Sequence, residues 1–248
     1  MTAVPRQRID HLLVVRGLSP SRARAQALVL AGEVYVAGIR ADKPGALVAE
    51  DAAIEVRGPD HAYVSRGGVK LASALDAFGL DVRGLCCLDL GASTGGFTDC
   101  LLQRGAAQVT AVDVGYGQLA YKLRMDPRVV VMERTNARSL TPEAAGGVAD
   151  LTVVDASFIG LGKLMPAIAL CTRSGGSLVA LVKPQFEAGR EAASRGKGVI
   201  RDETVRARAI DRAAEDVERA GFAIVAKCDS ALPGPKGNVE AFLHARRA

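Results

Sequence analysis

From Ser65 onward the chain alternates short apolar runs with amphipathic stretches, and this alternation limits the possible folds more than any other feature. Helical spacing extends over Val69–Phe78 and Glu203–Ala220, whereas the apolar runs have the length of strands: Cys86–Asp89, Val109–Asp113, Val129–Met132, Leu151–Asp155 and Leu178–Val182. Strands that alternate with helices build a parallel sheet covered on both faces. Phe222–Lys227 and Val239–His244 would add an antiparallel edge pair. We therefore predict a Rossmann-like α/β domain with a doubly wound, mostly parallel, seven-stranded sheet.

The first sixty residues have a different pattern and predict a small α+β domain. One helix is expected over Ile9–Arg16, closed by Gly17, and a second should begin at Ser19-Pro20, with Ser19 as its N-cap, and stop at Gly32. Short strands follow, over Val34–Val36, Ile39–Arg40 and Ile54–Val56, with a further one around Val48. A unit this small has little core of its own. The predicted organisation is a domain over 1–60, a linker over 61–64 and a larger domain over 65–248.

The charge of the chain is mildly basic overall and strongly basic near its start. Thirty-two basic and 27 acidic residues give a formal net charge of +5, which alone only leans toward a polyanionic partner. Within residues 1–24, however, Asp10 is the one acidic residue against five arginines: Arg6, Arg8, Arg16, Arg22 and Arg24. A solvated helix face would explain such a run, but guanidinium groups also suit phosphates well.

The remaining composition argues against several classes of protein. The five cysteines form no C-x-x-C pair and the three histidines are scattered, so no metal site is expected. The first residues contain no apolar signal core, and no apolar run has the length of a membrane span. We therefore expect a cytoplasmic protein without a membrane partner; the oligomeric state has no signature in the sequence.

The N-terminal pattern resembles an S4-type RNA-binding domain. The resemblance rests on three segments: Arg8-Ile9-Asp10-His11-Leu12-Leu13, Ser21-Arg22-Ala23-Arg24-Ala25 and Gly32-Glu33-Val34-Tyr35-Val36-Ala37-Gly38. In such domains a helix pair presents arginines to structured RNA. The residues predicted to contact RNA are Arg6, Arg8, Arg22 and Arg24, together with Arg66 and Lys197 of the larger domain. Lys197 lies in a charged stretch over 185–202, for which an unconstrained surface loop is an equally good interpretation.

A glycine-rich segment after the first strand of the larger domain predicts a cofactor site. The segment Asp89-Leu90-Gly91-Ala92-Ser93-Thr94-Gly95-Gly96-Phe97-Thr98 lacks the G-x-G-x-x-G spacing of a dinucleotide site, which is the alternative. It resembles the first motif of S-adenosylmethionine-dependent methyltransferases. Asp113 ends the second strand, where an acid can take both ribose hydroxyls, and Asn136 follows the third, near the expected adenine. The predicted cofactor residues are Asp89, Gly91, Ser93, Gly95, Gly96, Phe97, Asp113, Asn136 and Asp155.

Four charged residues stand at strand or helix ends and form the predicted catalytic set. Asp155 and Lys183 each end an apolar strand, Lys70 lies early in a helix, and Glu240 lies in the final strand. Each alone has a structural explanation, such as a lysine stretching to solvent. Together, Lys70, Asp155, Lys183 and Glu240 resemble the K-D-K-E tetrad of FtsJ-like RNA 2′-O-methyltransferases. The order of the S4-like segment, S-R-G-G-x-K-L, D-L-G-A-S-T-G-G-F-T-D, V-V-D-A-S-F, L-V-K-P-Q-F-E and G-N-x-E resembles the TlyA family over essentially the whole chain.

This resemblance implies S-adenosylmethionine-dependent methylation of ribose 2′-hydroxyls, of cytidine, in ribosomal RNA or ribosomal subunits. A neutral lysine amine could accept the hydroxyl proton, a second nearby cation would favour that neutral form, and the two carboxylates would hold the amines in line. We expect Lys183 to be the base and Lys70 the second cation. The alternatives are a haemolysin or other membrane-active protein, an RNA-binding protein with an inactive methyltransferase fold, and a methyltransferase of small molecules.

Overall fold

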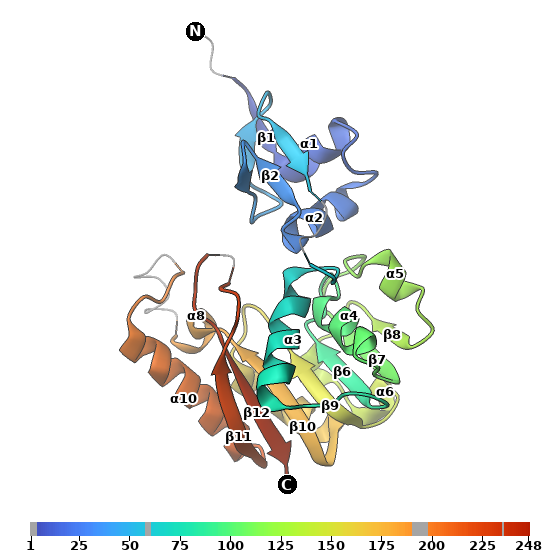
Figure 1. Ribbon diagram of the computed structural model, residues 1–248, viewed down its shortest axis with the longest axis vertical. Coiled ribbons are helices and arrows are strands. Elements are labelled where there is room, and N and C mark those ends of the chain that lie inside the picture. Colours follow the sequence, from blue (N-terminus) through green and yellow to red (C-terminus); the bar gives the residue numbers. More distant parts are fainter. Residues whose placement is uncertain (1–3, 58–60, 190–197, 235) are drawn as a thin grey trace.

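The computed structural model describes residues 4–57, 61–189, 198–234 and 236–248, and its larger part is built on one seven-stranded sheet (Figure 1). The strand order is β11-β12-β10-β9-β6-β7-β8. Five strands run parallel: β6 (Cys86–Leu90), β7 (Gln108–Val112), β8 (Val129–Met132), β9 (Ala149–Val154) and β10 (Thr172–Val182). Strand β12 (Ala241–Arg247) pairs antiparallel with β10 and with the edge strand β11 (Phe222–Asp229). The predicted doubly wound sheet and its antiparallel edge are confirmed.

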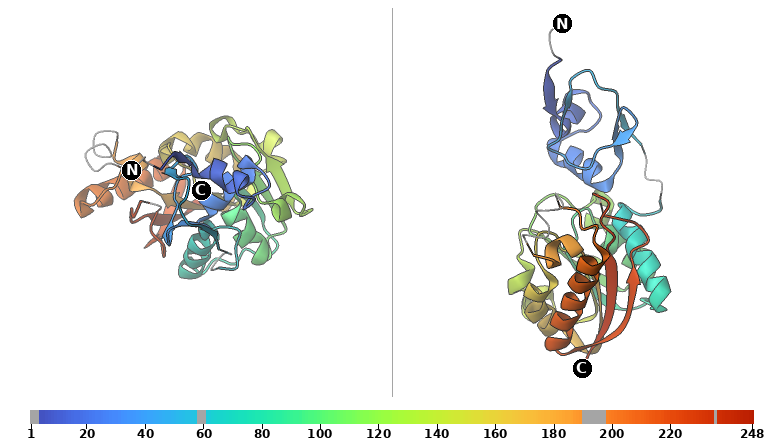
Figure 2. Two further views of the ribbon diagram at one scale, coloured as in Figure 1. Left: turned by 90° about the horizontal axis from the view of Figure 1, so that it is seen from above. Right: turned by 90° about the vertical axis from the view of Figure 1, so that its left-hand side faces the viewer.

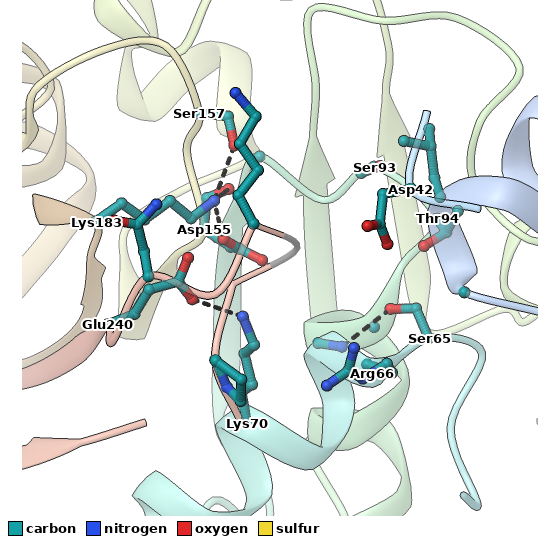
Figure 3. Close-up of a pocket in the computed structure, with 18 of the residues that line it drawn as sticks. Asp42, Ser65, Arg66, Lys70, Ser93, Thr94, Asp155, Ser157, Lys183 and Glu240 are labelled. Carbon is teal, nitrogen blue, oxygen red and sulfur yellow. Dashed lines mark hydrogen bonds and ion pairs between the residues drawn. The ribbon is translucent and has the colours of Figure 1, made fainter. Parts of the chain in front are cut away.

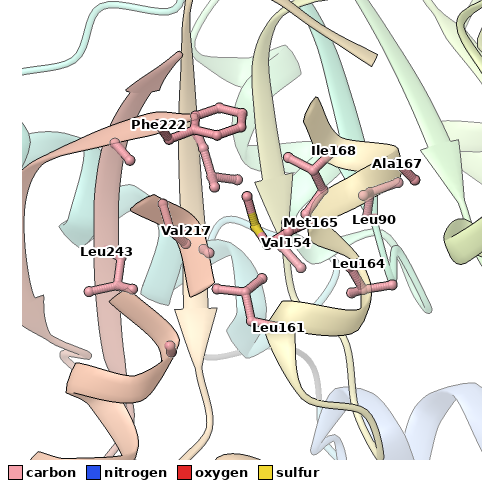
Figure 4. Close-up of a cluster of buried hydrophobic side chains, with 14 of the residues drawn as sticks. Leu90, Val154, Leu161, Leu164, Met165, Ala167, Ile168, Val217, Phe222 and Leu243 are labelled. Atoms are coloured by element: carbon pink, nitrogen blue, oxygen red, sulfur yellow. The ribbon is translucent and has the colours of Figure 1, made fainter. Parts of the chain in front are cut away.

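Alternate side chains along the strands point to opposite faces of the sheet and belong to two separate hydrophobic cores. Leu71, Leu75 and Phe97 of α3 (Arg66–Phe78) and α4 (Gly96–Gln103) pack on one face. The opposite core, shown in Figure 4, contains Met165 of α7 (Met165–Cys171) and Val217 of α10 (Glu203–Arg219). Short helical elements complete this part: α5 (Tyr121–Arg124), η1 (Ala137–Ser139), α6 (Pro142–Ala145), η2 (Leu161–Lys163) and α8 (Pro184–Glu187). Because both faces are covered, the ligand-binding edge is left at the strand ends.

The N-terminal part combines two helices with two small sheets. Its elements are β1 (Arg6–Arg8), α1 (Ile9–Val15), α2 (Arg22–Ala31), β2 (Val34–Val36), β3 (Ile39–Arg40), β4 (Leu47–Ala49) and β5 (Ile54–Val56). The strands pair as β3-β2-β5 and as β1-β4. Ile9, Leu13, Leu28 and Val34 belong to its small core. In Figure 2 this part stands over one end of the large sheet, with α2 closest to it.

Several boundaries differ from the prediction for local reasons. Helix α2 begins at Arg22, and its N-cap is Ser21, not Ser19: the Ser21 hydroxyl accepts a hydrogen bond from the amide of Arg24 at 3.2 Å. The buried Ser19 instead donates to the carbonyl of Ser21. The apolar segment Leu161–Cys171 is divided into η2 and α7. Strand β1 was not predicted, since three polar residues become a strand only by pairing with β4.

Among the described residues, no helix combines the length and the apolar character that crossing a membrane requires.

Candidate active site

A cavity of about 460 Å³ lies at the carboxyl ends of the parallel strands, between the two parts of the chain (Figure 3). It is placed where β6 and β9 are neighbours and their following loops diverge, which is the topological switch point of this strand order. The larger part lines it with the loop after β6, with the segments after β9 and β10, and with the start of α3. The N-terminal part contributes Val29, Leu30, Gly32, Arg40 and Asp42. No pattern in the sequence indicates that the small domain borders this site.

The loop after β6 needs glycine because other backbone segments approach it closely. Gly91 has φ +87°, and a Cβ there would lie 2.8 Å from the carbonyl oxygen of Asp155 at the end of β9. A Cβ on Gly96 would lie 2.2 Å from the Ser65 hydroxyl and 2.9 Å from the amide of Gly68. The first turns of α3 and α4 are therefore in direct backbone contact. This contact joins the S-R-G-G and G-G-F-T segments, which are separated in sequence.

Asp89 is fully buried near the end of β6, and only one of its two carboxylate oxygens accepts a hydrogen bond from the described residues. Its Oδ2 accepts a hydrogen bond from the Thr98 hydroxyl at 2.6 Å, whereas its Oδ1 has no partner among the described residues. Burial, together with the nearby carboxylates of Asp155 and Asp113, raises the pKa of Asp89 to about 7. A buried carboxylate oxygen without a donor fits a cationic ligand group.

Asp113 follows β7 and fastens the glycine loop. Its Oδ2 accepts from the amide of Ser93 at 2.8 Å, and its Oδ1 accepts from the amide of Gly115 at 2.7 Å. Each carboxylate oxygen keeps a second lone pair for a ligand hydroxyl. Asn136 caps η1, its side-chain oxygen accepting from the amide of Arg138 at 3.1 Å.

The predicted cofactor residues therefore divide into two groups. Those on the cavity wall are Gly91, Ser93, Gly96, Phe97 and Asp155. Phe97 is only 2% exposed, and its ring packs against Phe242 at a centroid distance of 6.1 Å, so it is mainly a core residue. Asp89, Gly95, Asp113 and Asn136 lie outside the wall, the first beneath the loop and Asp113 bonded to it.

All four predicted catalytic residues line this one cavity, and they form two lysine–carboxylate pairs. Nζ of Lys70 donates to Oε2 of Glu240 at 2.6 Å, in a pair whose side chains are 10% and 1% exposed. Nζ of Lys183 lies 2.5 Å from Oδ1 of Asp155. Figure 3 shows these residues arriving from α3, from the segments after β9 and β10, and from the segment before β12. Residues far apart in sequence thus converge because the sheet brings its strand ends together.

Comparison with known proteins agrees with this geometry. Residues 63–247 match the model of the FtsJ-like methyltransferase family, and residues 7–54 match that of the S4 domain. The chain belongs to the FtsJ-like methyltransferases, with an S4 domain at its N-terminus. It is 52% identical over 242 residues to the 16S/23S rRNA (cytidine-2′-O)-methyltransferase TlyA of Mycobacterium tuberculosis, covering 97% of this chain and 90% of that protein. The predicted TlyA family membership is confirmed.

Two further relatives carry haemolysin names. Hemolysin A of Brachyspira hyodysenteriae is 41% identical over 238 residues, with 96% of this chain and 98% of that protein covered. A solved structure described as a "putative hemolysin" from Streptococcus thermophilus has a TM-score of 0.76 at 40% identity and covers 99% of this chain and 90% of that chain. Relatives that are similar to nearly the whole chain therefore bear both names.

The FtsJ-like domain also holds polar and aromatic residues to which the sequence analysis gave no role. Ser157 accepts a hydrogen bond from Nζ of Lys183 at 2.8 Å. Phe158 is 91% exposed with φ +68°, and its ring contacts that of Phe186 at 5.4 Å between centroids. The V-V-D-A-S-F segment was the available signal, but exposure of an aromatic ring cannot be seen in a sequence. An exposed aromatic side chain on a cavity wall can stack on a nucleobase.

Two buried polar residues fix the segments that border the cavity. Asn238, 2% exposed, accepts from the amide of Ile200 and donates to the carbonyl of Gly198, both at 2.9 Å. Glu187 accepts from the amide of Leu161 at 2.7 Å, and burial raises its pKa. These bonds tie down the segment that precedes Glu240 and the segment that follows Lys183.

The arginines of the S4 domain are organised around a buried carboxylate. Asp10 accepts from Arg8 at 2.8 and 3.0 Å, from Arg22 at 3.1 Å and from Gln26 at 2.9 Å. The Arg8 hydrogen bonds are the main reason that the pKa of Asp10 lies well below its usual range. Both arginine side chains remain about half exposed.

The other residues predicted to contact RNA lie in different surroundings. Arg6 donates to the carbonyl of Leu47 at 2.7 Å, and Arg24 is exposed on α2. Arg66 lines the cavity itself. Lys197 lies outside the described residues. Of the five that lie within the described residues, the structure places one, Arg66, on the wall beside the catalytic set.

Proposed function

We propose that the chain transfers a methyl group from S-adenosylmethionine to a ribose 2′-hydroxyl of ribosomal RNA, with cytidine as the target nucleotide. The observation that carries this proposal is the convergence of Lys70, Asp155, Lys183 and Glu240 on a single cavity at the switch point of the sheet. The target and the nucleotide are taken from the name of the 52% identical relative. An S4 domain above the same cavity supports RNA as the substrate.

The residues around the glycine loop fit S-adenosylmethionine. When bound, this cofactor supplies a methyl group activated by a sulfonium. The buried Asp89, with its unpartnered Oδ1, offers negative charge to a ligand that carries a sulfonium and an ammonium group. Gly91 and Gly96 leave the wall open to close approach, and Asp113 ends the strand at which the ribose hydroxyls would be held. Asn136 is assigned to the neighbourhood of the adenine.

Lys183 is assigned the proton transfer. The 2′-oxygen of the substrate ribose would lose its proton to Nζ of the neutral Lys183 amine as its bond to the methyl group forms. The bond from that methyl to the sulfonium sulfur would break at the same time, and its electron pair would leave with the sulfur as a neutral thioether. Asp155 and Ser157 contact the same Nζ from two sides and would fix the direction of its lone pair. The buried Lys70–Glu240 pair contributes fixed charges on the adjacent wall. In-line positioning of the two reactants would supply much of the remaining acceleration.

Phe158 is assigned to the target base. An enzyme that draws a nucleotide into a cavity takes its base out of the stack, and an exposed aromatic ring can replace the lost stacking. Phe158 follows Ser157 in the chain and lines the same cavity as Lys183. Arg6, Arg8, Arg22 and Arg24 would bind phosphates farther along the RNA.

The test is to incubate purified ribosomal subunits with the protein and S-adenosylmethionine labelled in its methyl group. We expect label at the 2′-oxygen of discrete cytidines, read as resistance of the adjacent phosphodiester to alkaline hydrolysis. Lys183→Ala is the matched control and should bind cofactor without transferring label. Label on bases, or none from the wild-type protein on either subunit, would overturn the proposal.

A further inference from the structure

Two arginines from different domains meet at the rim of the catalytic cavity. Arg40 belongs to β3 of the S4 domain, and Arg66 is the first residue of α3 in the FtsJ-like domain. Both line the cavity that holds Lys183 and Asp155. A Cβ placed on Gly32 would lie 3.4 Å from Cδ of Arg40 and 3.5 Å from Cδ of Arg66. The two side chains therefore flank the same glycine at the end of α2.

The charges at this rim are incompletely balanced. Among the described residues, Arg40 is paired with one carboxylate, that of Asp42, at 3.1 Å, in a pair whose side chains are 27% and 40% exposed. Within the described part of the chain, no carboxylate is paired with Arg66. Two guanidinium groups thus lie at this rim with one carboxylate, which is paired with Arg40 alone. Since a partly exposed ion pair contributes little, an anion with more acceptor oxygens could take Arg40 from Asp42.

We propose that Arg40 and Arg66 together bind one backbone phosphate of the RNA, next to the nucleotide whose 2′-hydroxyl faces Lys183. This inference rests on the proposed function and gives the S4 domain a direct part in the substrate site. Guanidinium forks match phosphate geometry, and the bound phosphate neutralises the two cations that the domain arrangement brings together. Figure 3 shows Asp42 reaching from the S4 domain toward Ser93 and Thr94, so the same strand end faces the glycine loop.

A consequence is that RNA binding and domain arrangement depend on one another. One half of the phosphate site belongs to each domain, so the complete site exists only while the S4 domain stands over the cavity. A phosphate held by both arginines would favour that arrangement, because a ligand stabilises the state to which it binds better. The phosphate would thereby place the adjacent ribose at the tetrad.

The experiment is a double-mutant cycle on ribosomal RNA binding, measured over a series of salt concentrations. The variants are Arg40→Ala, Arg66→Ala and the double variant. The matched control is Arg57→Ala/Arg83→Ala, which removes the same charge from the same two domains at exposed positions away from the cavity. Cofactor affinity and the urea midpoint of unfolding report on folding, and Arg40→Lys and Arg66→Lys keep the charge while losing the fork.

Each single alanine variant should weaken RNA binding about tenfold, and the lysine variants should lose less. Because both side chains hold one phosphate, the double variant should lose clearly less than the product of the single losses. Its salt slope should fall by about one, as for the loss of a single phosphate contact. Cofactor affinity should not change.

Two results would overturn the inference. Losses that multiply fully, with a slope lowered by about two, would mean two separate phosphates. Losses no larger than those of the control would mean that the rim does not touch RNA. Both are binding results and do not depend on methyl transfer. If the wild-type protein bound RNA in this pattern but methylated nothing, the proposed function would fail while this site remained.

Discussion

The buried Lys70–Glu240 pair allows a sharp prediction about folding, separate from catalysis. Glu240→Leu would leave the Lys70 ammonium, 10% exposed, without the carboxylate that now lies 2.6 Å away. Removing one partner of a buried pair typically costs about 3–5 kcal/mol, because the remaining charge stays desolvated. The exposure here is so small that solvent screening should reduce this cost only slightly. We expect the free energy of unfolding to fall by about 3–5 kcal/mol.

The double variant Lys70→Met/Glu240→Leu should recover most of that loss, since an apolar pair of similar volume needs no compensating charge. The assay is urea unfolding, with the midpoint and the slope compared for both single variants and the double. Asp211→Leu is the matched control: its pair with Lys227 is exposed on both sides, so its loss should stay within about 1 kcal/mol. The stable double variant should bind cofactor yet transfer no methyl group.

Two outcomes would refute this reasoning. If Glu240→Leu cost no more than the exposed control, the pair would not be desolvated. If the double variant were as unstable as the sum of the single variants, the instability would come from lost packing around Glu240 and not from an unpaired charge.

Three shorter predictions concern other parts of the molecule. Burial raises the pKa of Asp89 from about 4 to about 7, so the stability linked to its proton is complete below pH 4 and is lost as the pH rises through 7. Asp89→Asn should therefore flatten the fall in unfolding free energy between pH 5 and 8. An unchanged pH dependence of the unfolding free energy, measured by urea titration, would contradict this. Phe158→Ala should lower kcat/KM for RNA about tenfold or more without changing cofactor affinity, since stacking is worth about 1–3 kcal/mol per base. Phe158→Trp should keep kcat/KM near the wild-type value. Equal kinetics of Phe158→Ala and the wild type would exclude stacking. Asp10→Asn should destabilise the S4 domain by about 2 kcal/mol and weaken RNA binding in filter assays, because Arg8 and Arg22 lose their shared partner; RNA affinity that survives this loss of stability would exclude phosphate contact by these two arginines.

The large sheet could be predicted from the sequence because its strands are short, continuous apolar runs. Val129–Met132 is a strand with the predicted bounds, and the runs around Leu88 and Val153 differ only at their ends. The predicted start of α2 was wrong because the sequence places two serines there, and either residue can cap a helix. Only the fold shows that the Ser21 hydroxyl, and not that of Ser19, reaches the free amide.

The candidate site was predicted as a set of residues but not as a geometry. Lys70 and Glu240 are 170 positions apart, and no local pattern says which lysine meets which carboxylate. The position of Arg40 at the cavity depends on how two domains meet, which periodicity does not encode. Phe158 was missed because phenylalanine side chains are usually buried, whereas this one is exposed.

The central claim is that Lys183 takes the proton of a ribose 2′-hydroxyl. Single-turnover methyl transfer to ribosomal RNA, measured across a pH series with the wild type, Lys183→Ala and Lys183→Arg, tests it most directly. Both variants should lose most of the rate at every pH while keeping cofactor affinity, because a guanidinium cannot act as a base near neutral pH. Near-normal rates for Lys183→Arg throughout the series would contradict the account and leave Lys183 as a residue that positions the substrate or stabilises charge.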